Sequence, residues 1–520
     1  MADYLMAIDA GTGSVRAVIF DGEGNQLGCG QREWSHREDP RYPGSMDFDW
    51  TANWNMVCAC IKEVLEKTGV KREALTAVST TCMREGIVLY DAAGNEIWAC
   101  ANVDSRSVDE VGQLKRLYPG LEQELYLESG QTFALGALPR LLWVKNKEPG
   151  LYKKTARIGM FNDWLIYRLS GVLAVEPSNG STTGLFDLKT RVWDKSIAKR
   201  CGLRDDIFPD VVECGVPVAK VSAKAAAETG LAEGTPLVTG GGDCQLGTIG
   251  VGAASVNEAV IFGGSFWQYE FNTGTGTPSP KYDIRVNCHA LPSLWQYEAL
   301  AFNPGLVMRW YRDGFCREEN RLALANGGGA YAVMDREAAK IPAGSYGMIC
   351  AFSDVMNYIA WRHAAPAFIN FELDADKFNK FTFYRAIMEN TALVTLGHVN
   401  LVYQAIGKKP DGVVFAGGAA KSGLWAQILA DVLGIPVRVP AVKEATALGA
   451  AILAGFGVGL FKDIKKSAQK LVKMEHEFKP NAENHGVYAA AYQAWQKTYT
   501  AHLKLSDAGI TKYMWRAPGL

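Results

Sequence analysis

Short β-branched runs that end in glycine turns most constrain how this chain folds. Four apolar runs stop at turns built from small residues, namely 5–8 before Asp9 and Gly11, 236–239 before Gly240, 259–262 before Gly263, and 413–415 before Gly417. Each pattern predicts a short buried strand followed by a turn whose backbone other groups can approach closely. Such turns at strand ends are where α/β proteins present backbone amides to phosphate groups.

Helical patterns alternate with these runs. Asp49 or Thr51 can cap a helix that ends before Gly69, with its apolar face formed by Trp54, Val57, Cys58, Ile61 and Leu65. Ser422 can cap a second helix that ends before Gly434, and its apolar positions are Leu424, Trp425, Ile428, Leu429 and Val432. Strands and helices mixed in both halves of the chain predict the α/β class.

A strand, glycine turn and strand occur twice, over residues 5–20 and again over residues 259–271. This repetition predicts a diverged internal duplication with a boundary near residue 254. We therefore expect two domains, 1–254 and 255–520, with a cleft between them. A length of 520 residues alone suggests about three domains, and the repetition favours two.

Composition excludes several classes of protein. A hydrophobic share of 48% argues against disorder, and 54 basic against 55 acidic residues argue against a nucleic-acid partner. Eleven scattered cysteines without a CxxC pair predict reduced thiols and no structural zinc. The sequence has neither a signal-peptide pattern nor an apolar run of membrane-spanning length, so we expect a cytoplasmic protein without a membrane partner. Nothing in it indicates the oligomeric state.

Common catalytic motifs are absent. The sequence has no Walker A pattern, no G-x-G-x-x-G after a strand, no H-E-x-x-H and no G-x-S-x-G. Two acids beside glycines remain, Asp9 and Asp243. Phosphoryl transfer needs groups that hold phosphates, a carboxylate near Mg²⁺ and a group that orients the acceptor hydroxyl. Asp9 with Thr12, Gly13 and Ser14 can supply the first two, and Asp243 can supply the third as a general base or, alternatively, cap a helix.

Five features occur in a fixed order along the chain: the segment from Asp9 to Arg16, Gly242-Asp243, Gly263-Gly264-Ser265, residues 302–313, and residues 415–418 before a helix. Together they resemble the FGGY family of sugar and polyol kinases. The resemblance covers essentially the whole chain. It implies an α/β fold of two ribonuclease-H-like domains, of the actin and hexokinase ATPase type, that close on ATP and Mg²⁺.

The resemblance also implies roles for individual residues. Asp243 matches the catalytic base, and Asp9 is expected to position the metal. The expected nucleotide-binding residues are Gly11, Thr12, Gly13, Ser14, Arg16, Gly264, Ser265, Gly305, Gly417, Gly418 and Ser422. The expected substrate-binding residues are Arg84, Glu85, Asn102, Asp104, Phe133 and Cys244. Because adjacent strand residues point to opposite faces, both Arg84 and Glu85 can enter one pocket only if a turn lies there.

Two departures from the family pattern concern the acceptor. Cys244 stands where many members have a glutamine that binds an acceptor hydroxyl, and Asn102 begins a segment where members often have a tryptophan. A site that reads hydroxyl groups rejects analogues strongly, so these changes argue against glycerol or a plain pentulose. We also expect the Cys244 thiol to be open to alkylation.

Stretches 83–90, 98–104, 263–268 and 515–520 are similar to one branch of the family. Members of this branch phosphorylate a small hydroxylated carbonyl compound of bacterial quorum sensing, 4,5-dihydroxypentane-2,3-dione, on its C5 hydroxyl, and the product relieves a transcriptional repressor. A kinase for a ketopentose or related polyol is the first alternative. A nucleotide-gated binding protein without catalysis is the second.

Overall fold

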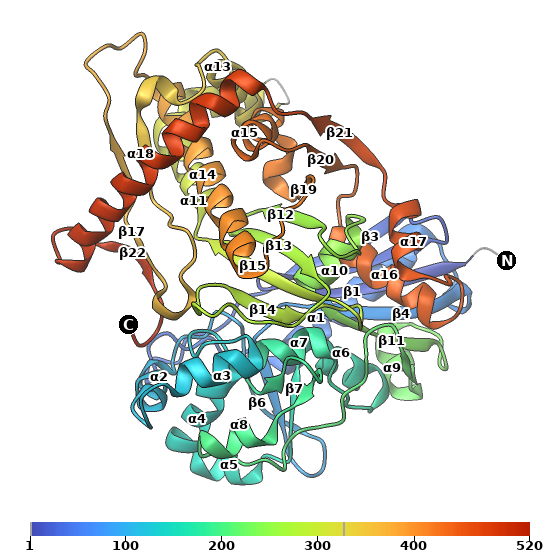
Figure 1. Ribbon diagram of the computed structural model, residues 1–520. Helices are drawn as coiled ribbons and strands as arrows, with labels where there is room; N and C mark the ends of the chain where they lie inside the picture. The colour runs from blue at the N-terminus through green and yellow to red at the C-terminus, as the bar shows by residue number, and fades with distance from the viewer. Residues whose placement is uncertain (1–2, 326–327) are drawn as a thin grey trace.

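The computed structural model describes residues 3–325 and 328–520, and two large mixed β-sheets dominate it (Figure 1). The first sheet contains, in spatial order, β10 (Pro217–Lys220), β11 (Pro236–Gly242), β4 (Leu75–Cys82), β1 (Tyr4–Ala10), β2 (Ser14–Asp21) and β3 (Gln26–Glu33). The second contains β14 (Arg285–Cys288), β15 (Trp295–Ala301), β13 (Trp267–Thr273), β12 (Ala259–Gly263), β19 (Val413–Ala416), β20 (Val437–Pro440) and β21 (Met474–Phe478).

The two sheets share one topology. In the first, β1, β2 and β3 form an antiparallel meander, and β4 and β11 follow in parallel on the other side of β1. In the second, β12, β13 and β15 are antiparallel neighbours in the same way, although β14 precedes β15 in the chain and pairs on its outer side. The strands β19 and β20 follow in parallel on the other side of β12. The predicted α/β class and internal repetition are therefore confirmed at the level of strand order and direction. Along the chain, residue 254 falls between β11, a strand of the first sheet, and β12, the first strand of the second sheet. The division of the chain into two domains at that residue stays a prediction.

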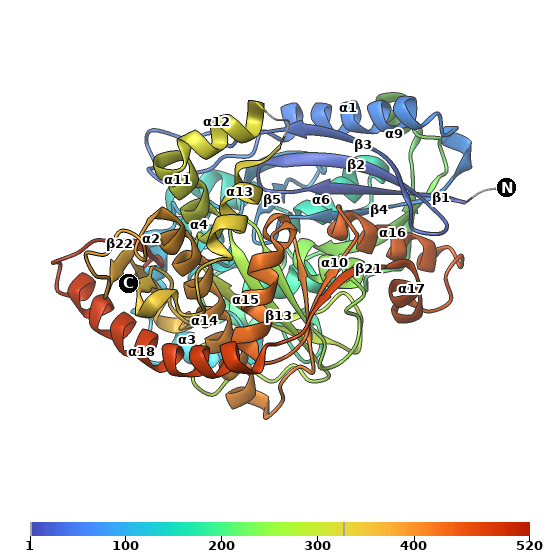
Figure 2. The same cartoon turned by 90° about the horizontal axis from the view of Figure 1, so that it is seen from above.

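Helices cover both faces of the first sheet (Figure 2). On one face lie α1 (Trp50–Thr68) and α9 (Ala223–Thr229), and on the other lie α10 (Asp243–Gly250), α16 (Ala445–Gly457) and α17 (Ile464–Leu471). The predicted caps of α1, Asp49 and Gly69, are confirmed. A side chain at Gly449 of α16 would come within 2.0 Å of a backbone oxygen of α10, so glycine is what lets these two helices approach.

The second sheet has one apolar and one polar face. On the apolar face, Trp267 and Tyr297 pack in a core with α14 (Lys380–Ile406), α15 (Gly423–Leu433) and α18 (Ala482–Asp507). As predicted, Ser422 caps α15 and Gly434 ends it. The polar face carries the alternate residues of the same strands, and these are also buried. Gln268 is partly buried. The others are almost completely buried, namely Glu270, Asn272, Arg285, Asn287, Gln296 and Glu298.

Further elements extend the first half of the chain. A sheet of β5 (Ile87–Tyr90), β6 (Glu96–Cys100) and β7 (Arg157–Met160) packs with α6 (Phe161–Ser170). Around them lie α2 (Val108–Lys115), α3 (Leu121–Ser129), α4 (Ala137–Lys147), α5 (Pro149–Lys154), α7 (Pro177–Gly180), α8 (Lys195–Arg200), β8 (Phe186–Asp187) and β9 (Val192–Trp193).

The C-terminal segment returns to the first half. After β15 come α11 (Pro304–Phe315), α12 (Arg317–Ala325), α13 (Ala330–Ala338), β16 (Ile349–Ala351), β17 (Arg362–Ala364) and β18 (Ala367–Ile369). The last strand, β22 (Tyr513–Arg516), pairs with β17, and a Cβ at Gly519 would lie 2.6 Å from Val111 of α2 (Figure 1). Within the described residues, no helix is long and apolar enough to cross a membrane.

Candidate active site at the ends of the parallel strands

Three parallel strands of the first sheet end at the same edge. Cys82, the last residue of β4, is in register with Ala10 of β1 on one side and with Gly242 of β11 on the other. The residues that follow these strands are therefore brought together, as ligand-binding residues are at the carboxyl ends of strands in open α/β sheets. They are the Gly11 turn, the Arg84-Glu85 pair and Asp243.

Asp243 is the first residue of α10. Its Oδ1 atom accepts a hydrogen bond from the Cys244 backbone N–H at 2.8 Å and lies 3.2 Å from Nε of Arg84. The side chain is 38% exposed, yet the protein around it is dense enough that burial raises the pKa of the carboxyl group, against the opposing effect of Arg84. Asp243 thus combines access with a pKa moved toward neutrality, two properties that suit a general base.

A turn brings both members of the Arg84-Glu85 pair into the site, as the sequence requires. Glu85 has a φ of 63°, in the left-handed region. Its carboxylate lies 2.6 Å from Nη2 of Arg285, while Arg84 Nη1 donates to Glu298. The two neighbouring side chains therefore meet charged partners from strands β14 and β15 of the second sheet. This pair connects the two halves of the chain.

Glu298 and Arg285 were not predicted from the sequence. Glu298 receives hydrogen bonds from Arg84, from Arg285 Nη1 at 3.2 Å and from Asn287 Nδ2 at 3.1 Å. Arg285 Nε donates to Gln131 at 2.7 Å. The signal that was available is the alternation of polar residues along 268–272, 285–287 and 296–298. Such alternation usually indicates a solvent-facing side of a sheet, whereas here it marks a face buried against the first half.

Side chains from other segments hydrogen-bond to the turn between β1 and β2. Trp34 Nε1 donates to the Gly11 carbonyl at 3.0 Å, and Asn102 Nδ2 donates to Thr12 Oγ1 at 3.0 Å. A Cβ built on Gly13 meets no described atom within 4 Å, so space lies next to this backbone. The turn predicted to hold phosphates is therefore open at Gly13, and it touches Asn102, which was predicted to bind the acceptor.

Arg16 connects this hairpin to the C-terminal half. Its Nη1 atom lies 2.7 Å from Glu444, the residue before α16, and its Nη2 donates to Ser14 Oγ at 3.2 Å. Arg16 also stands opposite Asp9 in the register of β1 and β2. The guanidinium group therefore fixes Ser14 and the start of α16 in relation to each other.

Asp9 has an electrostatic environment that suits a divalent cation. Burial raises its pKa to about 7, Arg16 lowers it, and the charges of Asp243 and Glu444 raise it further. A bound cation would relieve the repulsion among these carboxylates, and carboxylate oxygens are the ligands that Mg²⁺ prefers. The Asp9 carboxylate therefore fits such an ion.

A second group of glycines meets at the edge of the second sheet. Phe262 of β12 is in register with Ala416 of β19, so the turns after these parallel strands are neighbours. Gly417 has a φ of 92°, and a Cβ on it would lie 2.6 Å from the Gly263 carbonyl oxygen. A Cβ on Gly305 would lie 2.2 Å from the Gly264 carbonyl oxygen. Four predicted residues, Gly264, Ser265, Gly305 and Gly417, therefore lie together, with Gly418 beside them and open space around it.

Three other predicted residues are engaged within the protein. Ser422 Oγ accepts the Trp425 N–H as the cap of α15. The Asp104 carboxylate accepts from Arg106 and, at 2.6 Å, from the Met46 backbone N–H. Phe133 is 3% exposed in the core formed with α4. Their predicted contacts with nucleotide or acceptor stay predictions.

The expectation that Cys244 is open to alkylation is wrong. The residue is 4% exposed, and burial raises the pKa of its thiol well above the usual value. Its Sγ atom donates to Gln268 Oε1 at 3.2 Å. Because the thiolate is the reactive form, Cys244 is a poor nucleophile here. All eleven cysteines are free thiols, as predicted.

The site can be compared with known proteins. Models of the N-terminal and C-terminal domains of the FGGY family of carbohydrate kinases match residues 4–250 and 273–458. Two relatives, named autoinducer-2 kinase, from Yersinia enterocolitica and Yersinia pestis, are each 50% identical over 519 residues, which cover 100% of this chain and 98% of theirs.

Solved structures agree on the fold. A xylulose kinase from Rhodospirillum rubrum has a TM-score of 0.83 at 21% identity, and a glycerol kinase from Plasmodium falciparum with ADP has a TM-score of 0.83 at 19% identity. Each comparison covers 96% of this chain and 98% of the other. The predicted family and fold are confirmed: the chain belongs to the FGGY family of carbohydrate kinases.

Proposed function

We propose that this kinase transfers the γ-phosphoryl group of ATP to autoinducer-2, in its open-chain form 4,5-dihydroxypentane-2,3-dione, at the C5 hydroxyl. The support for this acceptor is the 50% identity, over the full chain, with relatives named autoinducer-2 kinase. In this role the phosphorylated product relieves a transcriptional repressor. Residues 1–254 would supply the acceptor site and the first phosphate-binding turn, and residues 255–520 the adenosine side.

The observation that carries the mechanism is the meeting of Arg84 and Asp243 at one sheet edge, 3.2 Å apart. Asp243 takes the proton of the C5 hydroxyl while that oxygen forms a bond to the γ-phosphorus. The bond between the γ-phosphorus and the bridging oxygen breaks, and ADP leaves. Arg84 keeps the Asp243 carboxylate oriented and favours its charged form.

The glycine turns would hold the nucleotide. Backbone amides of the Gly11–Ser14 turn and of Ser265 would donate to phosphate oxygens, a common arrangement at strand ends. The Gly264 N–H donates to the Phe266 carbonyl at 2.9 Å and so shapes the second turn. At Gly305, Gly417 and Gly418 the absence of a side chain would let the adenosine part of the nucleotide come close to the backbone. Mg²⁺, positioned by Asp9, would neutralise charge on the transferred phosphoryl group.

Product analysis with γ-labelled ATP tests this function. The enzyme is incubated with the dione, xylulose, ribulose or glycerol, and labelled products are separated and quantified, with Asp243→Asn as the control. We expect the highest kcat/KM for the dione and label on C5. A higher kcat/KM for a ketopentose would favour the alternative acceptor class, and ATP binding without any labelled product would favour a binding protein.

A further inference from the structure

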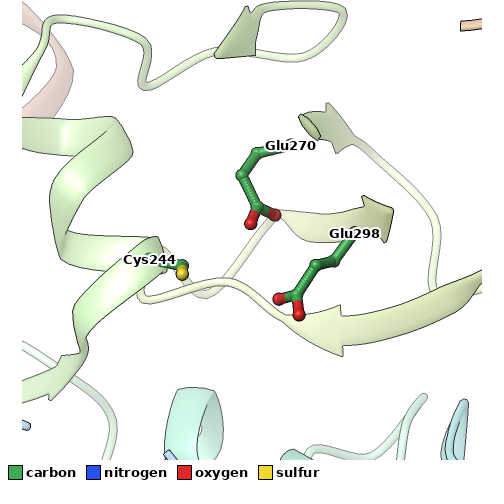
Figure 3. A group of neighbouring side chains, drawn as sticks. All are labelled: Cys244, Glu270 and Glu298. Carbon is green, nitrogen blue, oxygen red and sulfur yellow. The ribbon is translucent and has the colours of Figure 1, made fainter. Parts of the chain in front are cut away.

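Glu270 lies in a row of charged residues that crosses three strands. In β13 it stands directly opposite Glu298 of β15, which in turn stands opposite Arg285 of β14. Both glutamates are completely buried, and an oxygen of each lies within 4.8 Å of the other and of Cys244 Sγ. Figure 3 shows the two carboxyl groups on the side of the sheet that faces Cys244, the second residue of α10.

The two glutamates differ in their partners. Glu298 is hydrogen-bonded to both nearby guanidinium groups, because Arg84 and Arg285 each donate to its carboxylate. Among residues 3–325 and 328–520, neither carboxyl oxygen of Glu270 has a hydrogen-bond partner. Leaving a buried polar group without a partner costs about 1–3 kcal/mol, and more when the group is charged. Glu270 therefore weakens the fold unless something outside the chain completes its hydrogen bonding.

The environment favours the uncharged form of Glu270. Burial and the charge of Glu298 raise its pKa well above the usual range, and the charges of Arg84 and Arg285 only partly oppose this. Glu298, by contrast, has a lowered pKa because both guanidinium groups favour its carboxylate. A protonated carboxyl group has an O–H that can donate one hydrogen bond.

Glu270 is also close to the acceptor end of the site. Cys244, its neighbour, directly follows Asp243, and Arg84 contacts both Asp243 and Glu298. Gln268, two residues before Glu270 on the same side of β13, accepts from Cys244. The groups around Glu270 are thus those that border the Asp243 carboxylate. A costly polar group that has no internal function and lies beside a catalytic acid is typical of a ligand-binding position.

We propose that Glu270 is a specificity-determining residue, which contacts the acceptor and donates a hydrogen bond to one of its carbonyl oxygens. The pocket then takes hydroxylated carbonyl compounds in preference to polyols of the same length. This inference rests on the proposed kinase function, and it adds the residue that recognises the acceptor carbonyl by a hydrogen bond. Sites built to hydrogen-bond a substrate group discriminate strongly against analogues that lack it.

Two variants and two pairs of acceptors test the inference. Glu270→Met removes the donor at nearly constant volume, and Glu270→Gln keeps a donor in its amide. The acceptor pairs are the dione with pentane-1,2-diol, and xylulose with xylitol, so that each carbonyl compound has a partner without a carbonyl. We expect Glu270→Met to lower kcat/KM for the carbonyl member at least 10-fold and to leave that of its partner within 3-fold. Glu270→Gln should retain most of the discrimination.

Stability and metal content are measured on the same proteins. Because methionine replaces an unpartnered acid, the ligand-free Glu270→Met protein should melt at or above the wild-type temperature. Equal loss of kcat/KM for both members of a pair, or a lower melting temperature, would overturn the inference. So would a stoichiometric metal ion in the wild type that Glu270→Gln lacks.

The two proposals fail in different ways. If the wild type phosphorylates xylulose and not the dione, the proposed acceptor is wrong, and the xylulose and xylitol pair still decides the role of Glu270. If the dione is the best acceptor and Glu270→Met has the wild-type kcat/KM for both members of each pair, only the proposed role of Glu270 is wrong.

Discussion

Arg84 Nε lies 3.2 Å from Asp243 Oδ1, and the same guanidinium group donates to Glu298 of the second sheet. The side chain of Arg84 is 5% exposed and that of Glu298 is fully buried. One buried cation therefore orients the proposed base and fastens the two halves of the chain to each other. Stability and catalysis share this contact, and each can be measured separately.

Glu298→Gln should destabilise the protein. The change leaves Arg84 and Arg285 buried without their shared carboxylate, and removing one partner of a buried ion pair costs about 3–5 kcal/mol. Urea unfolding at neutral pH measures the loss. The matched control is Glu318→Gln, which breaks an exposed pair with Arg321 and should change the free energy of unfolding by less than about 1 kcal/mol. Equal effects of the two changes would contradict the account.

Gly242→Ala should lower turnover by displacing Arg84. A Cβ at this position would lie 2.9 Å from Cδ of Arg84 and 2.6 Å from Oε1 of Gln245. A misplacement of about 1 Å near the reacting groups can cost roughly 100-fold in rate, so we expect kcat to fall about 10- to 100-fold. Gly150→Ala, at a helical position where a Cβ meets nothing within 4 Å, is the control and should keep wild-type kcat. Wild-type kcat in both variants would show that Arg84 does not need its present position.

Local signals made much of the fold predictable from the sequence. Strand ends at glycine turns, the cap Asp49 and the repeated hairpin all depend on a few neighbouring residues, and these were confirmed. The positions of Asp243 and Arg84 follow as well, because parallel strands deliver their ends to one edge. Their role in catalysis stays a prediction.

The rest of the site depends on contacts between distant segments. Glu270, Arg285 and Glu298 alternate with apolar residues, a pattern that fits an exposed sheet face equally well. Only the packing of the second sheet against the first half buries them. The pairing of Arg16 with Glu444 spans 428 residues and has no local signal. Burial also raises the pKa of the Cys244 thiol and makes it unreactive, and its position beside Asp243 in the sequence does not indicate this.

Acid should weaken the fold through buried histidines, of which His398 is the clearest. Its Nε2 accepts the Met356 N–H at 3.1 Å, and burial lowers its pKa to about 3. The unfolded chain, with a pKa near 6.5, binds a proton at higher pH than the native state does, so this contribution is complete above pH 6.5 and is lost as pH falls toward 3.

At pH 5 the loss that comes from His398 is about 2 kcal/mol relative to pH 8. Unfolding of the wild type and of His398→Gln at the two pH values isolates it, since glutamine keeps an acceptor for Met356 and does not titrate. Burial and the neighbouring His398 also lower the pKa of His363 to about 3, so the difference between the two proteins includes the smaller effect of His398 on His363. The same pH dependence in both proteins would rule out this role for His398.

Thiol labelling should distinguish Cys29 from Cys244. Cys29 is partly exposed, whereas Cys244 is buried and its thiol pKa is raised well above the usual value. With iodoacetamide at pH 8, mass spectrometry should find Cys29 modified first and Cys244 modified only after unfolding in urea. Modification of Cys244 in the native protein as fast as Cys29 would contradict its burial.

Asp243→Asn tests the central claim most directly. This carboxylate is proposed to remove the acceptor proton, and a positioned general base contributes about 10²–10⁴-fold to the rate. With saturating ATP and the dione, we predict that kcat falls by at least 100-fold, while the dissociation constant for ATP stays within about 3-fold of the wild-type value. An Asp243→Asn enzyme that keeps the wild-type kcat would contradict the account.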